Sequence, residues 1–275
     1  MQCESVTEAI EVRLFLEAIH ARYGYDLRSY TPESMRRRVL TALAKSGLAH
    51  LGELQHRVLH EPDMFVSVLQ DLTVQTSDLF RDPSFCAAFR SRVVPVLRTY
   101  PLLRIWHAGC ASGEEAYSCA ITLSEEGLYE RAQLYATDLS VQAVAQAKLG
   151  VYDGTRLPAF EQNYAQAGGS GELASFCTQA YEHVAMKDSL RRNLLFFEHN
   201  LVSDAVFGEM HVIFCRNVFI YFQPELRRRV LRKFAQSLPP GGFLCLGSSE
   251  TLVLSGSAEF EPFVEAERIY RRTSA

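Results

Sequence analysis

The strongest constraint on the fold is an alternation of short apolar segments with helical ones after residue 102. The apolar segments are LLRIWHAG, AQLYATDL, LLFFEHN, HVIFCRNVFIYF and GFLCLGSS. Between them, EEAYSCAITLSEEG, SVQAVAQAKLG and PELRRRVLRKFAQSL carry helical patterns. This alternation predicts an α/β fold with a doubly wound, mostly parallel sheet. Ligands of such sheets bind at the carboxyl ends of the strands, so we expect the functional residues there.

Two other regions break the alternation. Residues 1–75 have a helix-start signal, YTPE, and their apolar side chains recur at roughly helical spacing at positions 10, 14, 16, 19 and 23. We therefore expect an all-α N-terminal domain, joined by a linker or helix over 76–101 to a domain at 102–275. Residues from about 151 to 193 are too many for a plain loop and predict a small inserted subdomain.

Composition excludes several functional classes. The chain has 275 residues, of which 48% are hydrophobic and 22% charged, as expected for one large or two modest globular domains. A net charge of −4 argues against a nucleic-acid partner, which needs a basic face. The sequence lacks an apolar run of membrane-spanning length and a basic, apolar leader, so we expect a cytoplasmic protein without membrane insertion.

Cysteine and histidine spacing gives no sign of a metal site. The seven cysteines form no CxxC pair, which disfavours both a zinc centre and a disulfide framework. His56 and His60 lie four residues apart, but the metalloprotease pattern HExxH is absent. We interpret them as surface histidines.

The segment HAGCASGEE follows the first predicted strand. Its small residues permit a tight turn, although it does not match the nucleotide pattern GxGxxG. The acidic residues Glu114 and Glu115 would repel a pyrophosphate and favour a ligand with an ammonium or sulfonium group. A tight turn without a ligand, and acids that only complement the helix dipole, are the alternatives.

Two further polar residues end strands. A carboxylate at Asp138, after YAT, is placed to accept ribose hydroxyls, or alternatively to cap the next helix. Asn200, after LLFFEH, offers a donor and an acceptor to an adenine edge. The small-residue loop, the acid and the amide together favour S-adenosylmethionine over a nicotinamide dinucleotide.

These motifs occur together in one family. The segments TVQTSDLFRDPSF, IWHAGCASGEEAYSCAI, YATDLS, FFEHNL, VIFCRNVFIYF and GGFLCLGSSE resemble the CheR-type chemotaxis receptor methyltransferases over almost the whole chain. The resemblance implies a class I S-adenosylmethionine-dependent methyltransferase fold with an all-α N-terminal domain and a small inserted β subdomain. It also implies methyl transfer from S-adenosyl-L-methionine to glutamate carboxylates on cytoplasmic chemoreceptor helices, leaving S-adenosyl-L-homocysteine.

The resemblance also assigns roles to individual residues. Glu115 matches the acid that holds the methionyl amino group, and Asp138 matches the ribose ligand. The other matches in the cofactor site are Gln75, Ser77, Arg81, Gly109, Asn200, Leu201, Arg216 and Asn217. Arg81 and Tyr221 match residues at the reacting end and are the candidate catalytic residues; a surface arginine and a buried aromatic are the alternatives.

Several positions depart from the family pattern. Gln75, Ser77 and Leu79 stand where the family usually has Asn, Thr and Phe, His107-Ala108-Gly109 replaces Ser-Ala-Ala, and Ala116 replaces Pro. The first three changes motivate a competing hypothesis, a cofactor-binding signalling module without turnover. A methyltransferase for a protein other than a receptor is a third hypothesis.

A glutamate acceptor needs little chemical help. Its carboxylate, with a pKa near 4.3, is ionised at neutral pH, so in-line positioning and desolvation replace a general base. Amine methyltransferases typically carry an Asn/Asp-Pro-Pro-aromatic segment after this strand, whereas this chain has Arg216-Asn217-Val218-Phe219. That difference agrees with a carboxylate acceptor.

Charge also suggests where a receptor binds. Residues 22–45 contain six basic and two acidic residues, and we expect Arg36, Arg37 and Arg38 to attract an acidic receptor helix. An ordinary solvated helix face is the alternative. The inserted subdomain binds a C-terminal receptor peptide in some family members and not in others.

Overall fold

The computed structural model describes residues 2–72, 77–206, 208–252 and 259–274. The chain divides into two compact units, one of Met1–Val74 with Tyr221–Arg229, the other of Gln75–Ile220 with Val230–Ala275. Residues 221–223 group with the first unit because their backbone pairs with residues 29–31. The Thr31 N–H donates to the Tyr221 carbonyl at 2.8 Å, and the Gln223 N–H donates to the Ser29 carbonyl at 3.0 Å.

The first unit is built from helices. They are α1 (Gln2–Tyr23), α2 (Pro32–Ser46), α3 (Leu51–His60) and α4 (Pro62–Leu72). The buried face of α1 carries Val12, Phe15, Leu16 and Ile19. Residues 10 and 14, which the helical spacing placed in the apolar stripe, are 45% and 51% exposed, so the buried stripe begins at Val12 and is rotated around the helix. The predicted all-α character is confirmed.

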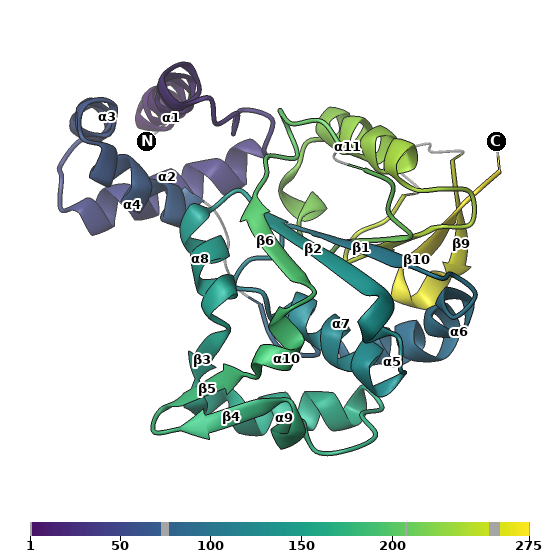
Figure 1. The fold of residues 1–275 in the computed structure, drawn as a ribbon. Helices are drawn as coiled ribbons and strands as arrows, with labels where there is room; N and C mark the ends of the chain where they lie inside the picture. The colour runs from purple at the N-terminus through teal and green to yellow at the C-terminus, as the bar shows by residue number, and fades with distance from the viewer. Residues whose placement is uncertain (1, 73–76, 207, 253–258, 275) are drawn as a thin grey trace. The chain divides into compact units, whose positions relative to one another are not determined.

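A seven-stranded sheet forms the centre of the second unit (Figure 1). In spatial order its strands are β6 (Leu194–Glu198), β2 (Ala132–Asp138), β1 (Leu103–Ala108), β7 (Val212–Cys215), β8 (Phe243–Leu246), β10 (Ile269–Arg272) and β9 (Phe260–Val264). The first five are parallel, and β10 is antiparallel to both its neighbours. The order reverses between β1 and β7, which places the topological switch point there. The predicted doubly wound, mostly parallel sheet is confirmed.

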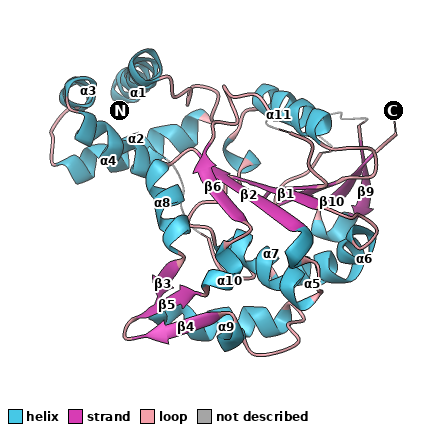
Figure 2. Cartoon of the chain, viewed as in Figure 1, coloured by secondary structure: helices cyan, strands magenta, loops and turns pink. Residues whose placement is uncertain are grey.

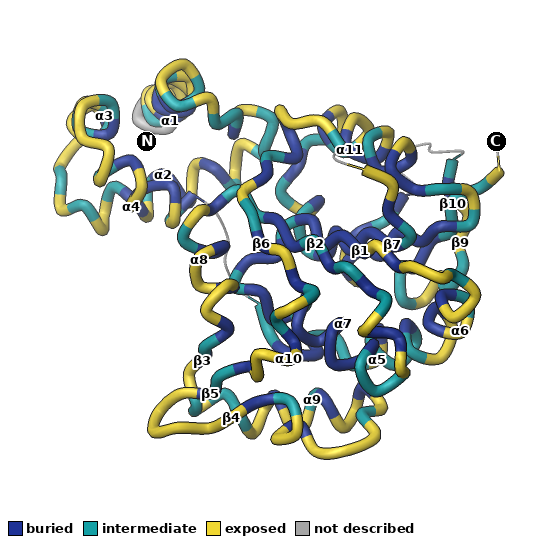
Figure 3. The backbone as a smooth tube through the Cα atoms, viewed as in Figure 1, coloured by how far each residue is buried: buried dark blue, intermediate teal, exposed yellow. Residues whose placement is uncertain are grey.

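Helices cover both faces of this sheet (Figure 2). They are α5 (Pro83–Ala88), the π-helix η1 (Phe89–Val93), α6 (Val94–Leu97), α7 (Glu114–Glu125), the turn η2 (Tyr129–Arg131), α8 (Val141–Leu149) and α11 (Pro224–Ser237). The side chains of neighbouring residues in β1 point to opposite faces of the sheet, as they do in any β-strand. Ile105 belongs to the core that includes Ile121 of α7, whereas the Trp106 ring lies 5.4 Å from that of Phe234 in α11. Figure 3 shows the central strands buried along most of their length.

Residues between β3 and β6 form a second, three-stranded antiparallel sheet, with order β3-β5-β4. Its elements are β3 (Val151–Asp153), the 3-10 turn η3 (Gly154–Arg156), α9 (Leu157–Gln166), the turn η4 (Leu173–Ser175), β4 (Cys177–Ala180), β5 (His183–Met186) and α10 (Asp188–Arg191). We call this segment the insert. It packs through buried aromatic rings such as Tyr152 and Phe160, whose centroids are 6.2 Å apart.

One predicted strand is shorter than expected. HVIFCRNVFIYF reads as a single apolar strand, but β7 ends at Cys215, and Phe219–Tyr221 is the 3-10 turn η5. Asn217 has a φ of +60°, a left-handed conformation that cannot continue a strand. The prediction of a strand through residue 222 was therefore wrong.

Across the described residues, we find no helix that combines the length and the apolar character of a membrane span.

Candidate active site

The strand ends on either side of the switch point carry the polar residues singled out in the sequence. The loop 109–113 follows β1, Asp138 ends β2, and Arg216 follows β7. The N–H groups of Gly109 and Cys110 both donate to the Thr137 carbonyl at 2.8 Å. The loop after β1 is thereby held against the end of β2.

Close packing fixes the shape of this loop. Gly109 has a φ of +85°, and a Cβ there would lie 2.5 Å from Cγ2 of Val218 in the loop after β7. Gly113 has a φ of +93°, and its Cβ would lie 2.8 Å from the Cβ of Ala147 in α8. Both positions therefore require glycine for conformation and for space.

Asp138 anchors the same loop from the neighbouring strand. Its Oδ2 accepts the Ala111 N–H at 2.9 Å and its Oδ1 accepts the Ser140 N–H at 3.0 Å. Burial raises the pKa of Asp138, against the opposing effect of these backbone hydrogen bonds. The N-cap of α8 is Ser140, whose hydroxyl accepts the Ala143 N–H. The alternative that Asp138 caps this helix was therefore wrong.

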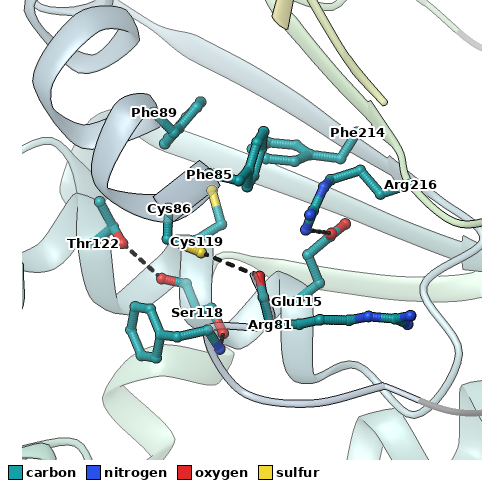
Figure 4. A pocket seen from close by; sticks show the side chains of 11 residues that line it. Arg81, Phe85, Cys86, Phe89, Glu115, Ser118, Cys119, Thr122, Phe214 and Arg216 are labelled. Carbon is teal, nitrogen blue, oxygen red and sulfur yellow. Dashed lines mark hydrogen bonds and ion pairs between the residues drawn. The ribbon is translucent and has the colours of Figure 1, made fainter. Parts of the chain in front are cut away.

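Glu115 and Arg216 form the centre of a partly buried charge cluster (Figure 4). Arg216 Nη1 lies 3.0 Å from Glu115 Oε2, and its Nη2 lies 2.6 Å from Asp82 Oδ2. The guanidinium carbon lies 3.9 Å from the centroid of the Phe85 ring. His107 Nδ1 lies 3.2 Å from the other Glu115 oxygen, and since a carboxylate only accepts, this nitrogen is the donor.

The cluster holds Glu115 in its ionised form. Burial alone would raise the pKa of Glu115, but the hydrogen bond from His107 and the charge of Arg216 together bring it below its usual value. Burial likewise opposes the charge of Arg216, yet Glu115 and Asp82 keep its pKa above the usual value. The ionised Glu115 carboxylate can accept a further hydrogen bond from a cationic group of a ligand.

Arg81 lies beside this cluster in a strained bend. It lines a small pocket together with Phe80, Phe85, Cys86 and Glu115, among others. Phe80 and Asp82, on either side of it, have φ values of +52° and +54°. In Figure 4 the Arg81 side chain extends past Glu115 and away from the aromatic rings. Non-glycine residues in this conformation persist only where surrounding contacts hold them, and they concentrate at functional sites.

The remaining predicted cofactor residues have local roles in the structure. Asn200 Oδ1 accepts the Val202 N–H at 2.9 Å, which forms a turn after β6 that includes the buried Leu201. The Asn217 N–H donates to Glu250 Oε2 at 3.0 Å. The Ser77 carbonyl accepts a hydrogen bond from Arg156, and Gln75 lies outside the described residues.

Tyr221 and the predicted receptor-binding arginines belong to the first unit. Arg36 pairs with Glu8, and Arg37 is exposed. Arg38, in contrast, is 6% exposed; its Nη1 donates to the Leu72 carbonyl at 2.8 Å, and its guanidinium lies 4.5 Å from the Tyr221 ring centroid. The inclusion of Arg38 in an exposed cationic face was wrong because that side chain is buried, and a receptor-binding role of Arg36 and Arg37 stays a prediction.

Comparison with known proteins decides the family. Residues 75–268 match the family described as CheR methyltransferase, SAM binding domain, and residues 10–73 match the CheR methyltransferase all-alpha domain. The chain belongs to the CheR methyltransferase family. It is thus an S-adenosylmethionine-dependent methyltransferase by family, as the sequence resemblance implied.

Full-length relatives agree with this assignment. The chain is 46% identical over 265 residues to a Pseudomonas putida protein named "Putative methyltransferase Cher3", covering 96% of this chain and 97% of that protein. It is 32% identical to chemotaxis protein methyltransferase 1 of Pseudomonas aeruginosa, with 87% and 88% of the two chains covered. For the chemotaxis protein methyltransferase of Vibrio parahaemolyticus the identity is 30%, with 88% and 89% covered.

The residues at the sheet edge fit S-adenosylmethionine. The Glu115 oxygens accept hydrogen bonds from His107 and Arg216, and the Asp138 carboxylate accepts the N–H groups of Ala111, Leu139 and Ser140; a carboxylate has about four acceptor sites, so both groups have capacity for a ligand. The Glu115 carboxylate suits the ammonium group of the cofactor, and the Asp138 carboxylate suits its ribose hydroxyls. In the described part of the chain, no group of three or more His, Cys, Asp or Glu residues is arranged to hold a metal ion.

Sequence reasoning missed residues that organise this site. Glu250 is buried and accepts the N–H groups of Gly247, Asn217 and Ile220, so it holds the loop after β7 in place of strand pairing. Burial raises the pKa of Glu250, and these backbone donors oppose the rise. The sequence feature that could have indicated Glu250 is its position at the end of the motif GGFLCLGSSE. Asp82 follows Arg81 directly, but nothing in the sequence pairs it with Arg216.

Proposed function

We propose that this enzyme methylates side-chain carboxylates of glutamate residues on chemoreceptor helices, forming methyl esters that adjust sensory signalling. The observation that carries this proposal is the position of Arg81, in a strained bend beside Glu115. A guanidinium there attracts and orients a carboxylate and repels the cationic form of an amine. The names of the relatives as chemotaxis methyltransferases point to the same class of substrate.

The protein's contribution is binding, orientation and exclusion of water. We assign Glu115 to the amino group of the cofactor and Asp138 to its ribose, with Gly109 and Asn217 shaping the two loops between them. When bound, S-adenosylmethionine supplies an electrophilic methyl group on a sulfonium. An acceptor glutamate is ionised at neutral pH and needs no residue to remove a proton.

Arg81 orients the acceptor in this proposal. A charge-assisted hydrogen bond fixes one carboxylate oxygen and leaves the other for reaction. Tyr221, which follows the loop of Arg216 in sequence, is proposed as a second contact of the acceptor. Orientation of this kind accounts for large rate effects without any change in proton affinity.

The receptor is proposed to bind to the helical unit through its exposed basic residues. Arg36 and Arg37 of α2 are exposed, and a receptor segment rich in glutamate has the complementary charge. Such charges act mainly on the rate of encounter and are screened by salt.

A matched set of acceptor peptides tests the reaction class. Helical peptides that differ at one position, with Glu, Gln or Lys, are incubated with the enzyme and cofactor carrying a deuterated methyl group, then analysed by mass spectrometry. We expect label only on the Glu peptide, and its loss after mild alkali. Label on the Lys peptide, or alkali-stable label, would overturn the proposal.

An Arg81→Gln variant separates acceptor orientation from cofactor binding. We expect kcat to fall about a hundredfold, since misplaced reactants lose that order of rate, with a much smaller change in cofactor Kd by calorimetry. A weaker cofactor Kd with unchanged kcat would place Arg81 at the cofactor alone.

A further inference from the structure

Arg156, the last residue of the turn η3 in the insert, joins three separate segments. Its Nη1 lies 3.0 Å from Glu114 Oε1 in the first turn of α7, and its Nη2 lies 2.8 Å from Asp78 Oδ1. The same Nη2 donates to the Ser77 carbonyl. One guanidinium therefore connects the insert, the helix that carries Glu115, and the segment that leads to Arg81.

The contact with Glu114 is a buried one. The Glu114 side chain is 0% exposed, and its Oε2 accepts the Ser112 hydroxyl at 2.7 Å. Burial of a carboxylate costs free energy unless it is paired with an opposite charge and hydrogen-bonded. Arg156, which lies 42 positions further along the chain, supplies this charge. The contact is therefore more than an incidental surface ion pair.

The segment that Arg156 holds, residues 77–82, has other contacts of the same kind. Asn163 of α9, also in the insert, donates through Nδ2 to the Leu79 carbonyl at 3.1 Å. The Phe80 N–H donates to the Ser118 hydroxyl of α7 at 2.8 Å. Since Phe80 and Asp82 flank Arg81 in strained conformations, external contacts of this type are what keep the bend in shape.

We propose that Arg156 is a positioning residue, through which the insert sets the orientation of Arg81 at the reacting end of the site. The inference rests on the role proposed above for Arg81. Arg156 acts on the backbone and carboxylate that precede Arg81, and Glu115 and Asp138 keep their own contacts without it. Loss of the contacts that Arg156 makes with residues 77–78 should therefore lower kcat far more than cofactor affinity.

The Asp78→Ala variant removes the ion pair between Arg156 and Asp78 and should have little effect on stability. The Asp78 side chain is 48% exposed, and its removal leaves Arg156 paired with Glu114. We expect kcat to fall about tenfold or more, while calorimetric Kd for S-adenosylhomocysteine changes less than about twofold. Amide hydrogen exchange should accelerate at residues 79–82 and not across the sheet.

Arg156→Lys provides a second variant, which does not leave the buried Glu114 carboxylate without a cation. A lysine keeps the positive charge for Glu114 but lacks the planar fork that reaches three acceptors. We expect near-normal stability with reduced kcat and faster exchange at residues 79–82. Arg192→Gln is the matched control, because Arg192 lies in the insert but its ion pair with Glu130 is at the surface; it should change none of these quantities.

Unchanged kcat and unchanged exchange at residues 79–82 in both variants would overturn the proposal. A uniform rise in exchange with a proportional loss of stability would do the same, because it identifies a purely structural role. The exchange measurement needs no acceptor. Failure of the wild-type enzyme to methylate a glutamate peptide would therefore count against the proposed function, while the positioning role would still be decided by exchange.

Discussion

Arg216 Nη1 lies 3.0 Å from Oε2 of Glu115, although the two residues are 101 positions apart. The contact joins the loop after β7 to the first turn of α7, across the switch point of the sheet. With Asp82 and His107 it orients the Glu115 carboxylate before any ligand binds, which lowers the cost of ordering that side chain on binding.

Removal of Arg216 should therefore destabilise the second unit. Its side chain is buried against Phe85, and the change Arg216→Gln removes the guanidinium that pairs with both Glu115 and Asp82. We expect the free energy of unfolding in urea to fall by about 3 kcal/mol. The same change at Arg232, an exposed arginine of α11, should cost little; equal costs at the two sites would show that the cluster adds no stability.

The pH dependence of stability should report the ionised Glu115. Burial works against ionisation, but His107 and Arg216 outweigh it and lower the pKa of Glu115 below 4.5. Ionised Glu115 therefore contributes its full stabilisation at pH values above its pKa in the unfolded state. This stabilisation is lost as the pH falls through the lower pKa of the folded state. In urea unfolding, the stability difference between wild type and Glu115→Gln should shrink as the pH falls below about 5. A constant difference would contradict this account.

The tight contact at Gly109 can be tested by compensation. In Gly109→Ala, conformational strain of about 1 kcal/mol adds to an overlap with Val218 that costs about 1–3 kcal/mol. Gly127→Ala is the control, since its φ is +68° but no atom lies within 4 Å of the added Cβ. Adding Val218→Ala should recover part of the loss in Gly109→Ala. If thermal unfolding shows no recovery, the overlap is not the cause.

Asp138→Ala should weaken cofactor binding by about tenfold or more, since ribose hydrogen bonds and the anchor of the loop at Ala111 are both lost. Calorimetry with S-adenosylhomocysteine measures the effect. Asp188→Ala is a suitable control because that side chain is 97% exposed. An unchanged Kd in Asp138→Ala would remove Asp138 from the cofactor site.

The arginines of α2 should separate into two classes. The double change of Arg36 and Arg37 to Ala should slow receptor methylation at low salt, spare cofactor binding and lose its effect at high salt. Arg38→Ala should instead lower the stability of the helical unit by about 1–3 kcal/mol, because it leaves the buried Leu72 carbonyl without its donor. Equal methylation rates at low salt would exclude the steering role.

The sheet was predictable because its central strands are nearly continuous apolar runs, as buried parallel strands require. The end of β7 was not predictable, since apolar residues continue through Phe222. The strand ends because Asn217 has a left-handed backbone conformation and its N–H group donates to Glu250. The β9–β10 pair was also missed, because FEPFV and IYRR are short and interrupted by charged residues or proline, and so lack that apolar signal.

The site was predictable to the level of single residues but not of pairs. Glu115 and Asp138 could be placed at one sheet edge because the strand ends they follow meet there. No local spacing relates Asp82 to Arg216, or Glu114 to Arg156, so these contacts needed coordinates. The burial of Arg38 did have a signal: Met35, Val39 and Ala42 place the buried face of α2 at the same helical phase.

The most direct test of glutamate methylation is transfer of a labelled methyl group from S-adenosylmethionine to receptor-containing membranes, followed by mild alkali. The account predicts label on a receptor band and its release as volatile methanol, as expected for a carboxyl methyl ester. Label that stays on the protein after alkali would contradict it, because the acceptor would then be nitrogen or another stable group.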